Sequence, residues 1–297
     1  MKAVDQVSLH IDPGEILGVV GESGCGKSLT SLAVLQLIPS PGKMLSGDIQ
    51  FDGRSLCELT AEQMRRIRGK EMAFIPQDPM TSLNPVYTIG NQLTEVICLH
   101  QGVSEQEARK VAIEALDQVR LPNAKGRFDQ YPHEFSGGMR QRVLIAMALS
   151  CQPKLLIADE PTTALDVTVQ AQILDLMREL QQDLGMSILL ITHDMGVVAE
   201  TCHRVAVMYA GRVVEEAPVE TLFANPHHPY TAGLLAAIPS MGDRKALKPI
   251  DGQPPAVGAI PDYCAFADRC DKVFDTCTTI LPPHREIAPE HYSACLL

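Results

Sequence analysis

A glycine-rich stretch near the start of the chain has the residue types and the spacing that bind a nucleotide triphosphate. It reads Gly21-Glu22-Ser23-Gly24-Cys25-Gly26-Lys27-Ser28 and follows a short apolar run, 16–20, that predicts a strand. In this spacing backbone N–H groups surround the phosphates, the lysine adds positive charge and the serine hydroxyl binds Mg²⁺. The helix that follows, beginning near Leu29, directs the positive end of its dipole at the same anion. The stretch therefore predicts a phosphate-binding loop.

A second glycine-containing stretch lies at 135–141, reading Phe135-Ser136-Gly137-Gly138-Met139-Arg140-Gln141. Its glycines allow another backbone to approach closely. A helix is expected over 143–149, with its N-terminus facing an anion. The phosphate-loop pattern by itself also matches unrelated glycine-rich turns, so the order of several motifs is needed to raise its specificity.

Three further apolar runs end in polar side chains that suit ATP chemistry. The run 155–158 leads into Asp159-Glu160, the run 187–191 leads into Thr192-His193-Asp194, and the run 72–75 is followed by Gln77. Taken singly, an Asp-Glu pair after a strand is commonly a solvated helix start, and a lone histidine is more often structural than catalytic. Five such features in one order favour a nucleotide site.

The order of these motifs resembles that of ATP-binding cassette (ABC) proteins, in which the serine–glycine signature lies between the phosphate loop and the acidic strand end. The resemblance implies that Glu160 is the general base that polarises the attacking water, and that His193 contacts the γ-phosphate. The catalytic residues that it implies are Glu160, His193, Gln77 and Lys27. Magnesium would be held, through ATP, by Ser28, Gln77 and Asp159. The nucleotide contacts that it implies are loop residues Gly21 to Ser28, Leu29, Gln77, Asp159, Ser136, Gly137, Gly138, Gln141 and, in the D-loop Ala164-Leu165-Asp166, Asp166.

The resemblance also implies the fold class: an α/β cassette with a parallel-sheet core, a small antiparallel β layer and an inserted helical subdomain. Alternation at 4–11 and the run 47–51 predict strands of the small layer. The helical subdomain is expected at about 82–150, where Ser104 and Glu107 form a capping box. The apolar stripe of a helix over 169–184 is assigned to the fold alone. The predicted domains are the ATPase at 1–235 and a cysteine-containing extension at 236–297.

Composition and charge narrow the class of protein. The chain has 297 residues with 45% hydrophobic content, enough for a large core. No apolar run approaches the roughly 18 residues of a membrane span, and the start lacks an apolar signal core, so a cytoplasmic location is expected. The net charge of −11 argues against nucleic acid as a partner, because a phosphate-tracking surface is basic.

Longer stretches resemble the ATPases of dipeptide and oligopeptide importers. They are 78–85, 131–142, 158–166 and 225–231. The resemblance implies ATP hydrolysis coupled to uptake of peptides, or alternatively of nickel, glutathione or another small solute. It implies a peripheral position on the cytoplasmic face of the inner membrane. The implied partners are two integral-membrane permeases, a second ABC ATPase subunit and, indirectly, an external solute-binding protein. Residues 77–85 and Glu134 would contact the permeases.

In this family two ATP molecules lie between two cassettes, each bound by the phosphate loop of one and the signature of the other. The chain has one loop and one signature, so the second cassette is another copy or a related chain. Chromosome-holding ABC ATPases carry a long coiled-coil insertion that is absent here. The alternative of a non-catalytic, redox-sensing adaptor would require a broken catalytic set, and the set is intact.

The cysteines form three groups. Cys25 lies in the phosphate loop at a helix N-terminus, where a lowered thiol pKa and reactivity blocked by MgATP are expected. Four scattered cysteines are expected to be buried; they are Cys57, Cys98, Cys151 and Cys202. The four cysteines of the tail are Cys264, Cys270, Cys277 and Cys295. Their spacing lacks C-x-x-C pairs, which leaves a [4Fe–4S] cluster, zinc and free thiols all open. The importer resemblance implies the cluster.

The remaining features are a pair of adjacent histidines and the lack of an aromatic residue upstream of the phosphate loop. His227 and His228 stand beside a proline with no third ligand nearby in sequence, so a capping or packing role is favoured over a metal site. No aromatic residue precedes Gly21, although relatives stack adenine on one upstream of the loop. Either an upstream start or weaker ATP binding is expected, by about ten- to a hundredfold if stacking is lost.

Overall fold

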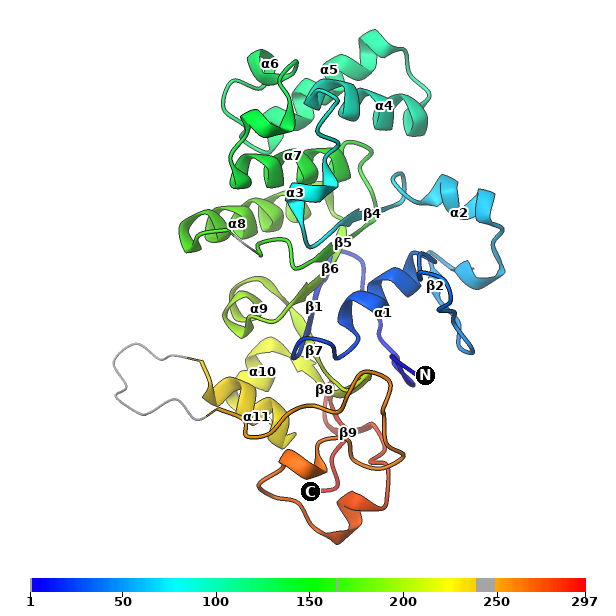
Figure 1. Ribbon diagram of the computed structural model, residues 1–297, viewed down its shortest axis with the longest axis vertical. Helices are drawn as coiled ribbons and strands as arrows, with labels where there is room; N and C mark the ends of the chain where they lie inside the picture. Colours follow the sequence, from blue (N-terminus) through cyan, green and yellow to red (C-terminus); the bar gives the residue numbers. More distant parts are fainter. Residues whose placement is uncertain (1, 164, 239–248) are drawn as a thin grey trace. The chain divides into compact units, whose positions relative to one another are not determined.

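The computed structural model describes residues 2–163, 165–238 and 249–297. The chain, drawn as a ribbon in Figure 1, divides into two compact units. Unit 1 comprises 1–30 and 190–297, and unit 2 comprises 31–189. The predicted boundary near residue 235 is a different division, based on family resemblance, and stays a prediction. Within the described residues, none of the helices combines the length and the apolar character that crossing a membrane requires.

Unit 1 is built on a mixed sheet. Its strands follow one another in the order β1-β7-β8-β10-β9, and the end of β6 (Ser187–Thr192) lies beside β1. Their bounds are β1 Ile16–Val20, β7 Arg204–Tyr209, β8 Arg212–Pro218, β9 Arg285–Ala288 and β10 His291–Ser293. Strands β1 and β7 are parallel, with Val20 opposite Val207, and the later pairs are antiparallel. All five residues of β1 are buried, which explains its unbroken apolar sequence.

The helices of unit 1 pack their apolar residues onto this sheet. They are α9 Met195–Thr201, α10 Val219–Ala224 and α11 Pro229–Ala236. The core contains Tyr209, Tyr230 and Phe266, whose rings lie 4.6–5.4 Å apart by centroid. Because Phe266 comes from the C-terminal extension, the extension shares the core of unit 1.

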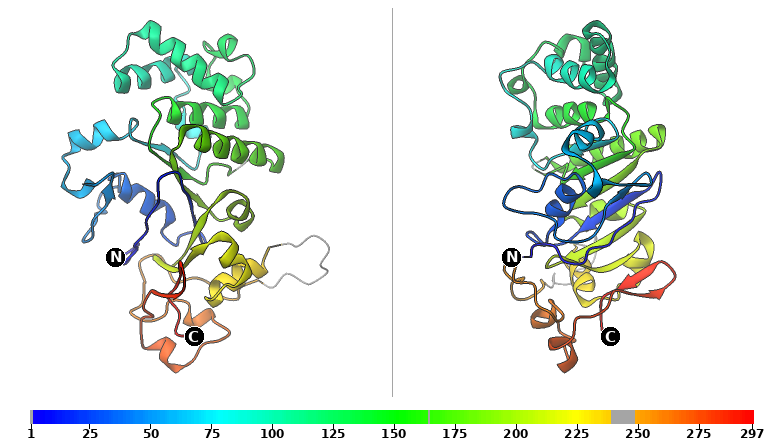
Figure 2. Two further views of the ribbon diagram at one scale, coloured as in Figure 1. Left: turned by 180° about the vertical axis from the view of Figure 1, so that it is seen from behind. Right: turned by 90° about the vertical axis from the view of Figure 1, so that its right-hand side faces the viewer.

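The extension also joins the sheet of unit 1. Strand β10 pairs with β8 through Tyr292 opposite Glu216, and Figure 2 shows the red C-terminal strands beside it. Two short 3₁₀ turns, η3 Ala267–Arg269 and η4 Asp275–Thr278, precede these strands in the chain. The tail is therefore an integral part of unit 1.

Unit 2 contains a parallel strand group and a stack of helices. Its strands follow the order β4-β5-β6, with bounds β4 Met72–Ile75, β5 Leu155–Asp159 and β6 Ser187–Thr192; the last residues of β6 belong to unit 1. Ile75 lies opposite Ala158, so β4 and β5 end at the same edge. The predicted strands at 16–20, 72–75, 155–158 and 187–191 are confirmed.

The predicted helical region is confirmed within unit 2 (Figure 1). Its helices are α3 Pro79–Ser82, α4 Ile89–Gln101, α5 Glu105–Gln118, α6 Ala124–Arg127 and α7 Gly137–Leu149. The Ser104–Glu107 capping box is present at the start of α5. The other helices are α2 Ala61–Ile67, α8 Val167–Leu184 and α1 Lys27–Val34, which begins in unit 1.

Several expectations about local structure are wrong. No strand forms at 4–11, although Val7, Leu9 and Ile11 are less exposed than the residues between them, as the alternation predicted. An extended segment becomes a strand only when a neighbour accepts its ladder hydrogen bonds. In the described residues the antiparallel layer contains only β2 Gln50–Phe51 paired with β3 Arg54–Ser55. The four scattered cysteines were expected to be buried, but Cys57 is exposed and Cys98, Cys151 and Cys202 are only partly buried.

A further correction concerns the helix after the signature. It was expected to begin at Val143, but α7 begins at Gly137. Ser136 is its N-cap, and the Ser136 hydroxyl accepts a hydrogen bond from the Met139 N–H at 3.4 Å. A serine cap outweighs the low helix propensity of the two glycines that follow it. The helix N-terminus therefore lies at the signature itself.

Candidate functional site

The predicted site residues fall in both units. The phosphate loop and His193 belong to unit 1, whereas Gln77, Asp159, Glu160 and the signature belong to unit 2.

The phosphate loop leaves β1 through tightly packed glycines. A Cβ on Gly21 would lie 2.2 Å from the Met208 carbonyl oxygen and 2.8 Å from the Cys25 Sγ atom. Gly24 and Gly26 have φ of +80° and +104°, which glycine adopts without strain. These glycines produce the close turn that connects a buried strand to the start of α1.

Lys27 lies inside this loop. Its side chain is 5% exposed, and its ammonium donates hydrogen bonds to the carbonyl oxygens of Gly21 at 2.7 Å and Glu22 at 3.1 Å. A buried ammonium group is costly unless it is hydrogen-bonded, and the loop carbonyls supply that compensation. The charge is thereby held against the backbone of the loop that is expected to bind an anion.

Cys25 is not the reactive thiol that its position at a helix N-terminus predicted. Its side chain is 5% exposed, and burial raises its pKa, with Lys27 offsetting part of that effect. A neutral, covered thiol is a poor nucleophile. Desolvation outweighs the helix dipole, so Cys25 packs in the loop as a small side chain.

His193 follows β6 and is exposed. The next residue, Asp194, caps α9: its Oδ1 accepts hydrogen bonds from the N–H groups of Gly196 at 2.7 Å and Val197 at 3.4 Å. This cap ends the strand and begins the helix at a defined residue, which fixes the backbone on which His193 stands.

In unit 2 the ends of β4 and β5 bring Gln77 and Glu160 together. The Gln77 side-chain amide donates to the Glu160 Oε2 atom at 2.9 Å, and the Thr163 hydroxyl donates to the same oxygen at 2.9 Å. Asp159, the last residue of β5, is 5% exposed. Glu160 itself has φ of +48°, an uncommon conformation for a residue with a side chain. Such backbone strain is frequent at functional positions.

The signature and the D-loop are helix starts in unit 2. A Cβ on Gly138 would lie 2.6 Å from Val169 of α8, so this glycine allows α7 and α8 to approach closely. Asp166 is the N-cap of α8, and its Oδ1 accepts from the Val169 N–H at 2.9 Å. Ala164 of the predicted D-loop lies outside the described residues. Gln141 is fully buried, and its amide atoms have no hydrogen-bond partner among the described residues.

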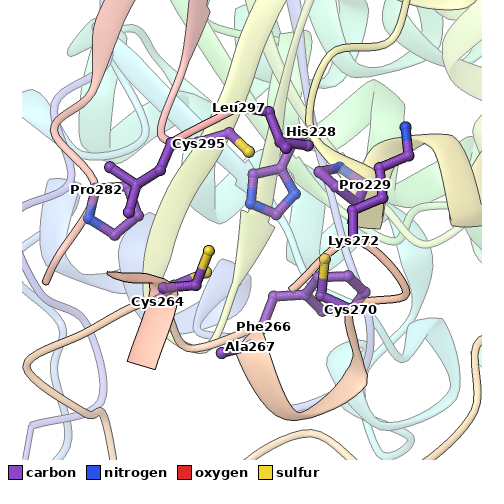
Figure 3. A pocket seen from close by; sticks show the side chains of 12 residues that line it. His228, Pro229, Cys264, Phe266, Ala267, Cys270, Lys272, Pro282, Cys295 and Leu297 are labelled. Carbon is purple, nitrogen blue, oxygen red and sulfur yellow. The ribbon is translucent and has the colours of Figure 1, made fainter. Parts of the chain in front are cut away.

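The four tail cysteines line one small pocket of unit 1, together with His228 and Lys272 (Figure 3). Burial raises the pKa of Cys264 and Cys270, and the neighbouring cysteines raise it further. Among the described residues, however, no group of three or more His, Cys, Asp or Glu side chains could hold a metal ion. The structure therefore gives the expected iron–sulfur cluster no support beyond the convergence of the thiols.

The two adjacent histidines cap and pack, as predicted. The His228 Nδ1 atom accepts a hydrogen bond from the Tyr230 N–H at 3.1 Å at the start of α11, and His227 Nδ1 lies 3.0 Å from the Ser293 hydroxyl. Burial lowers the pKa of His228 to about 3.

This pKa shift makes a testable contribution to stability. The unfolded chain protonates His228 near pH 6.5 and the folded chain does not, so stability is fully present above pH 6.5 and falls as the pH drops toward 3. We expect the free energy of unfolding to fall between pH 7 and pH 5 by about 2 kcal/mol more in the unmodified chain than in His228→Asn. Asparagine retains an acceptor for the cap but does not titrate. Urea unfolding at the two pH values measures the difference, and identical pH slopes would contradict the assignment.

Sequence reasoning missed two residues that contact the phosphate loop. The Tyr230 hydroxyl accepts a hydrogen bond from the Glu22 N–H at 2.9 Å. The Arg269 guanidinium pairs with the Glu22 carboxylate at 2.7 Å and 2.9 Å. Both lie more than 200 positions away along the chain, so no local pattern predicts these contacts. An arginine amid the tail cysteines was the one available signal.

Comparison with known proteins finds family models and relatives that this chain matches. Residues 4–163 match the family model described as ABC transporter, and residues 214–277 match that of the oligopeptide/dipeptide transporter C-terminal region. The oligopeptide transport ATP-binding protein of Bacillus subtilis is 50% identical, over 98% of this chain and 82% of its own length. The dipeptide transport ATP-binding protein of Escherichia coli is 47% identical, over 99% and 90%. A dimeric ATP-binding cassette structure with bound ADP and Pi is 29% identical with a TM-score of 0.64, covering 73% of this chain and 90% of that one.

Proposed function

Because the chain belongs to the ABC transporter ATP-binding family, as an α/β cassette ATPase with the C-terminal region of oligopeptide and dipeptide transporters, we propose that it powers the uptake of di- or oligopeptides. The observation that carries the cargo class is near full-length similarity to importer subunits named for those peptides. Nickel, glutathione and other small solutes are the competing cargoes. The proposal includes two permeases, a second ABC ATPase subunit and an external binding protein, with this subunit on the cytoplasmic face of the inner membrane.

We assign roles to the site residues as follows. ATP is the nucleotide, held by the loop with Lys27 against its phosphates and with Mg²⁺ on Ser28, Gln77 and Asp159. Glu160 accepts the proton of the attacking water, and the hydrogen bonds from Gln77 and Thr163 orient its carboxylate. His193 contacts the γ-phosphate. Ser136, Gly137, Gly138, Gln141 and Asp166 serve the nucleotide of the second cassette. The buried position of Gln141 supports an indirect role for it, through the packing of α7.

Magnesium supplies charge stabilisation for the phosphoryl group when it is bound. The chain's own contribution is to hold oxygen donors at the ends of β4 and β5, and the hydrogen bond between Gln77 and Glu160 supports that placement. A carboxylate, an amide oxygen and a hydroxyl are the donor types that Mg²⁺ prefers.

The iron–sulfur cluster is a separate proposal. Four cysteines lining one pocket match the donor set of a [4Fe–4S] cluster in type and number. The side chains as placed do not fit a metal, so no mechanistic step is derived from a cluster. Iron and acid-labile sulfide analysis of chain purified without oxygen tests it. About four irons per chain support the cluster; zinc at one per chain or no metal at all removes it.

The transport proposal is tested on the assembled complex. We expect its ATP turnover to rise when the binding protein is loaded with a di- or oligopeptide, and to stay at its basal rate with the binding protein loaded with a nickel chelate or glutathione. Stimulation by one of those solutes and not by peptide would transfer the motor to another cargo. Absence of turnover under every condition would return the chain to the adaptor class.

A further inference from the structure

Arg269 connects the cysteine-containing tail to the phosphate loop inside unit 1. It is the last residue of η3 and immediately precedes Cys270. Its side chain is 5% exposed and forms a two-pronged ion pair with Glu22, with nitrogen–oxygen distances of 2.7 Å and 2.9 Å. Glu22 is the second residue of the phosphate loop. A residue near the C-terminus is therefore in direct contact with the segment that binds ATP.

The Arg269 guanidinium also contacts several groups other than Glu22. Its Nε donates to the Asp251 carbonyl oxygen at 3.0 Å, and one terminal nitrogen donates to the Tyr209 hydroxyl at 3.3 Å. The rings of Tyr209 and Phe266 lie 5.7 Å and 5.9 Å from its central carbon. The ion pair raises the pKa of Arg269 above its ordinary value. An arginine fixed on so many sides loses little further conformational freedom on pairing.

The backbone of Glu22 is hydrogen-bonded as well. Its N–H donates to the Tyr230 hydroxyl at 2.9 Å, and its carbonyl oxygen accepts from the Lys27 ammonium at 3.1 Å. The backbone of Glu22 is thus bonded to α11 and to the lysine of the loop, while its carboxylate is bonded to the tail. A displacement of Arg269 would be transmitted to the carbonyl that Lys27 uses.

The negative charge of Glu22 affects how well the loop binds a triphosphate. A carboxylate in a loop that binds a triphosphate repels the ligand unless a cation neutralises it. Arg269 is that cation, and it lies in a covered position where solvent screens the pair weakly. Removing Arg269 would leave the Glu22 carboxylate in the loop without this cation.

We propose that Arg269 is a positioning residue for ATP binding: it neutralises and anchors Glu22, so that the C-terminal tail sets the affinity of the phosphate loop for MgATP. This inference rests on the proposed nucleotide role of the loop. It assigns the tail a function in the ATPase that requires no metal.

The test is a double-mutant cycle on the full chain, with the dissociation constant of MgATP measured by titration calorimetry. We expect Arg269→Met to raise that constant roughly tenfold at low salt, and less at high salt. Glu22→Gln alone should lower it, because the loop then has one negative charge fewer while the Arg269 charge remains. Adding Glu22→Gln to Arg269→Met should restore most of the affinity, since the repelling carboxylate is gone.

A purely structural role for Arg269 gives a different pattern. In that case the double variant binds as weakly as Arg269→Met, and this absence of rescue would overturn the proposal; so would an unchanged constant in Arg269→Met. Arg204→Met is the matched control. Arg204 is a similarly covered arginine, paired with Glu15 and Glu216 at the opposite end of β1, and its loss should lower stability without changing MgATP affinity.

A substitute variant and the unmodified chain distinguish failure of this proposal from failure to fold or to bind nucleotide. If Arg269→Met does not fold, Arg269→Lys replaces it: lysine keeps the charge but loses the two-pronged geometry, so its affinity should fall less than tenfold and improve with Glu22→Gln. An equal constant in Arg269→Lys with and without Glu22→Gln would then overturn the proposal. Failure of the unmodified chain to bind MgATP would instead refute the nucleotide role of the loop, which is a separate result.

Discussion

Replacing Glu160 by glutamine should reduce ATP turnover of the assembled complex at least about a hundredfold while MgATP still binds. Glutamine has the same size, and its amide oxygen still accepts the hydrogen bonds from Gln77 and Thr163. It does not accept the proton of the attacking water. Hydrolysis is therefore blocked with the site otherwise intact, and the two cassettes should stay closed on uncleaved ATP.

Phosphate release from the purified complex measures turnover, and retention of radiolabelled ATP after gel filtration measures trapping. Glu179→Gln is the control: Glu179 is an exposed carboxylate of α8 paired with Arg120 in the same unit, and its loss should leave turnover unchanged. Normal turnover in Glu160→Gln would remove this residue from the role of general base.

The second large effect is expected at Gly21. Gly21→Ala places a methyl group 2.2 Å from the backbone oxygen of Met208, and a backbone atom of a buried strand has little room to move. We expect the free energy of unfolding to fall by about 3 kcal/mol and MgATP affinity to fall with it, because the loop must shift away from β7.

Gly185→Ala separates this clash from the ordinary cost of losing a glycine. Gly185 ends α8 with φ of +63° and has open space where the Cβ would lie. Its substitution should cost about 1 kcal/mol, from backbone conformation alone, and leave nucleotide binding unchanged. Equal losses in the two variants, measured by urea unfolding, would contradict a close packing of the loop against β7.

The sequence predicted the elements of the fold well wherever the pattern was local. The apolar runs at 72–75 and 155–158 are strands because both faces are buried, and the cap at Ser104 begins a helix because its side chain bonds a nearby N–H group. These features depend on residues within one or two turns of one another. Local chemistry was sufficient to find them.

Expectations that depended on the surroundings were less accurate. Alternation at 4–11 correctly predicted which side chains are more covered, but a strand also needs a hydrogen-bonding neighbour. Cys25 has the helix-terminal position of a reactive thiol, yet burial dominates its pKa. Burial and pairing are properties of the folded chain, and a short stretch of sequence does not contain them.

In the candidate site, too, residues of local motifs were predicted and contacts between distant residues were not. The motifs identified Lys27, Gln77 and Glu160, and the structure shows the contacts that Lys27 makes within the loop and those that join Gln77 to Glu160. The contact between Glu22 and Arg269 was invisible in sequence because it joins residues 247 positions apart. The tail sequence indicates a metal site or free thiols, whereas its arginine supplies a direct physical connection to the nucleotide loop.

Peptide uptake tests the central claim most directly. The complex, with both permeases, the second ATPase and the binding protein, is reconstituted into vesicles with ATP on the side of this subunit, and entry of a radiolabelled dipeptide or oligopeptide is followed. The account predicts ATP-dependent accumulation that stops in Glu160→Gln and persists in Glu179→Gln. Accumulation that proceeds equally without ATP, or in Glu160→Gln, would contradict it.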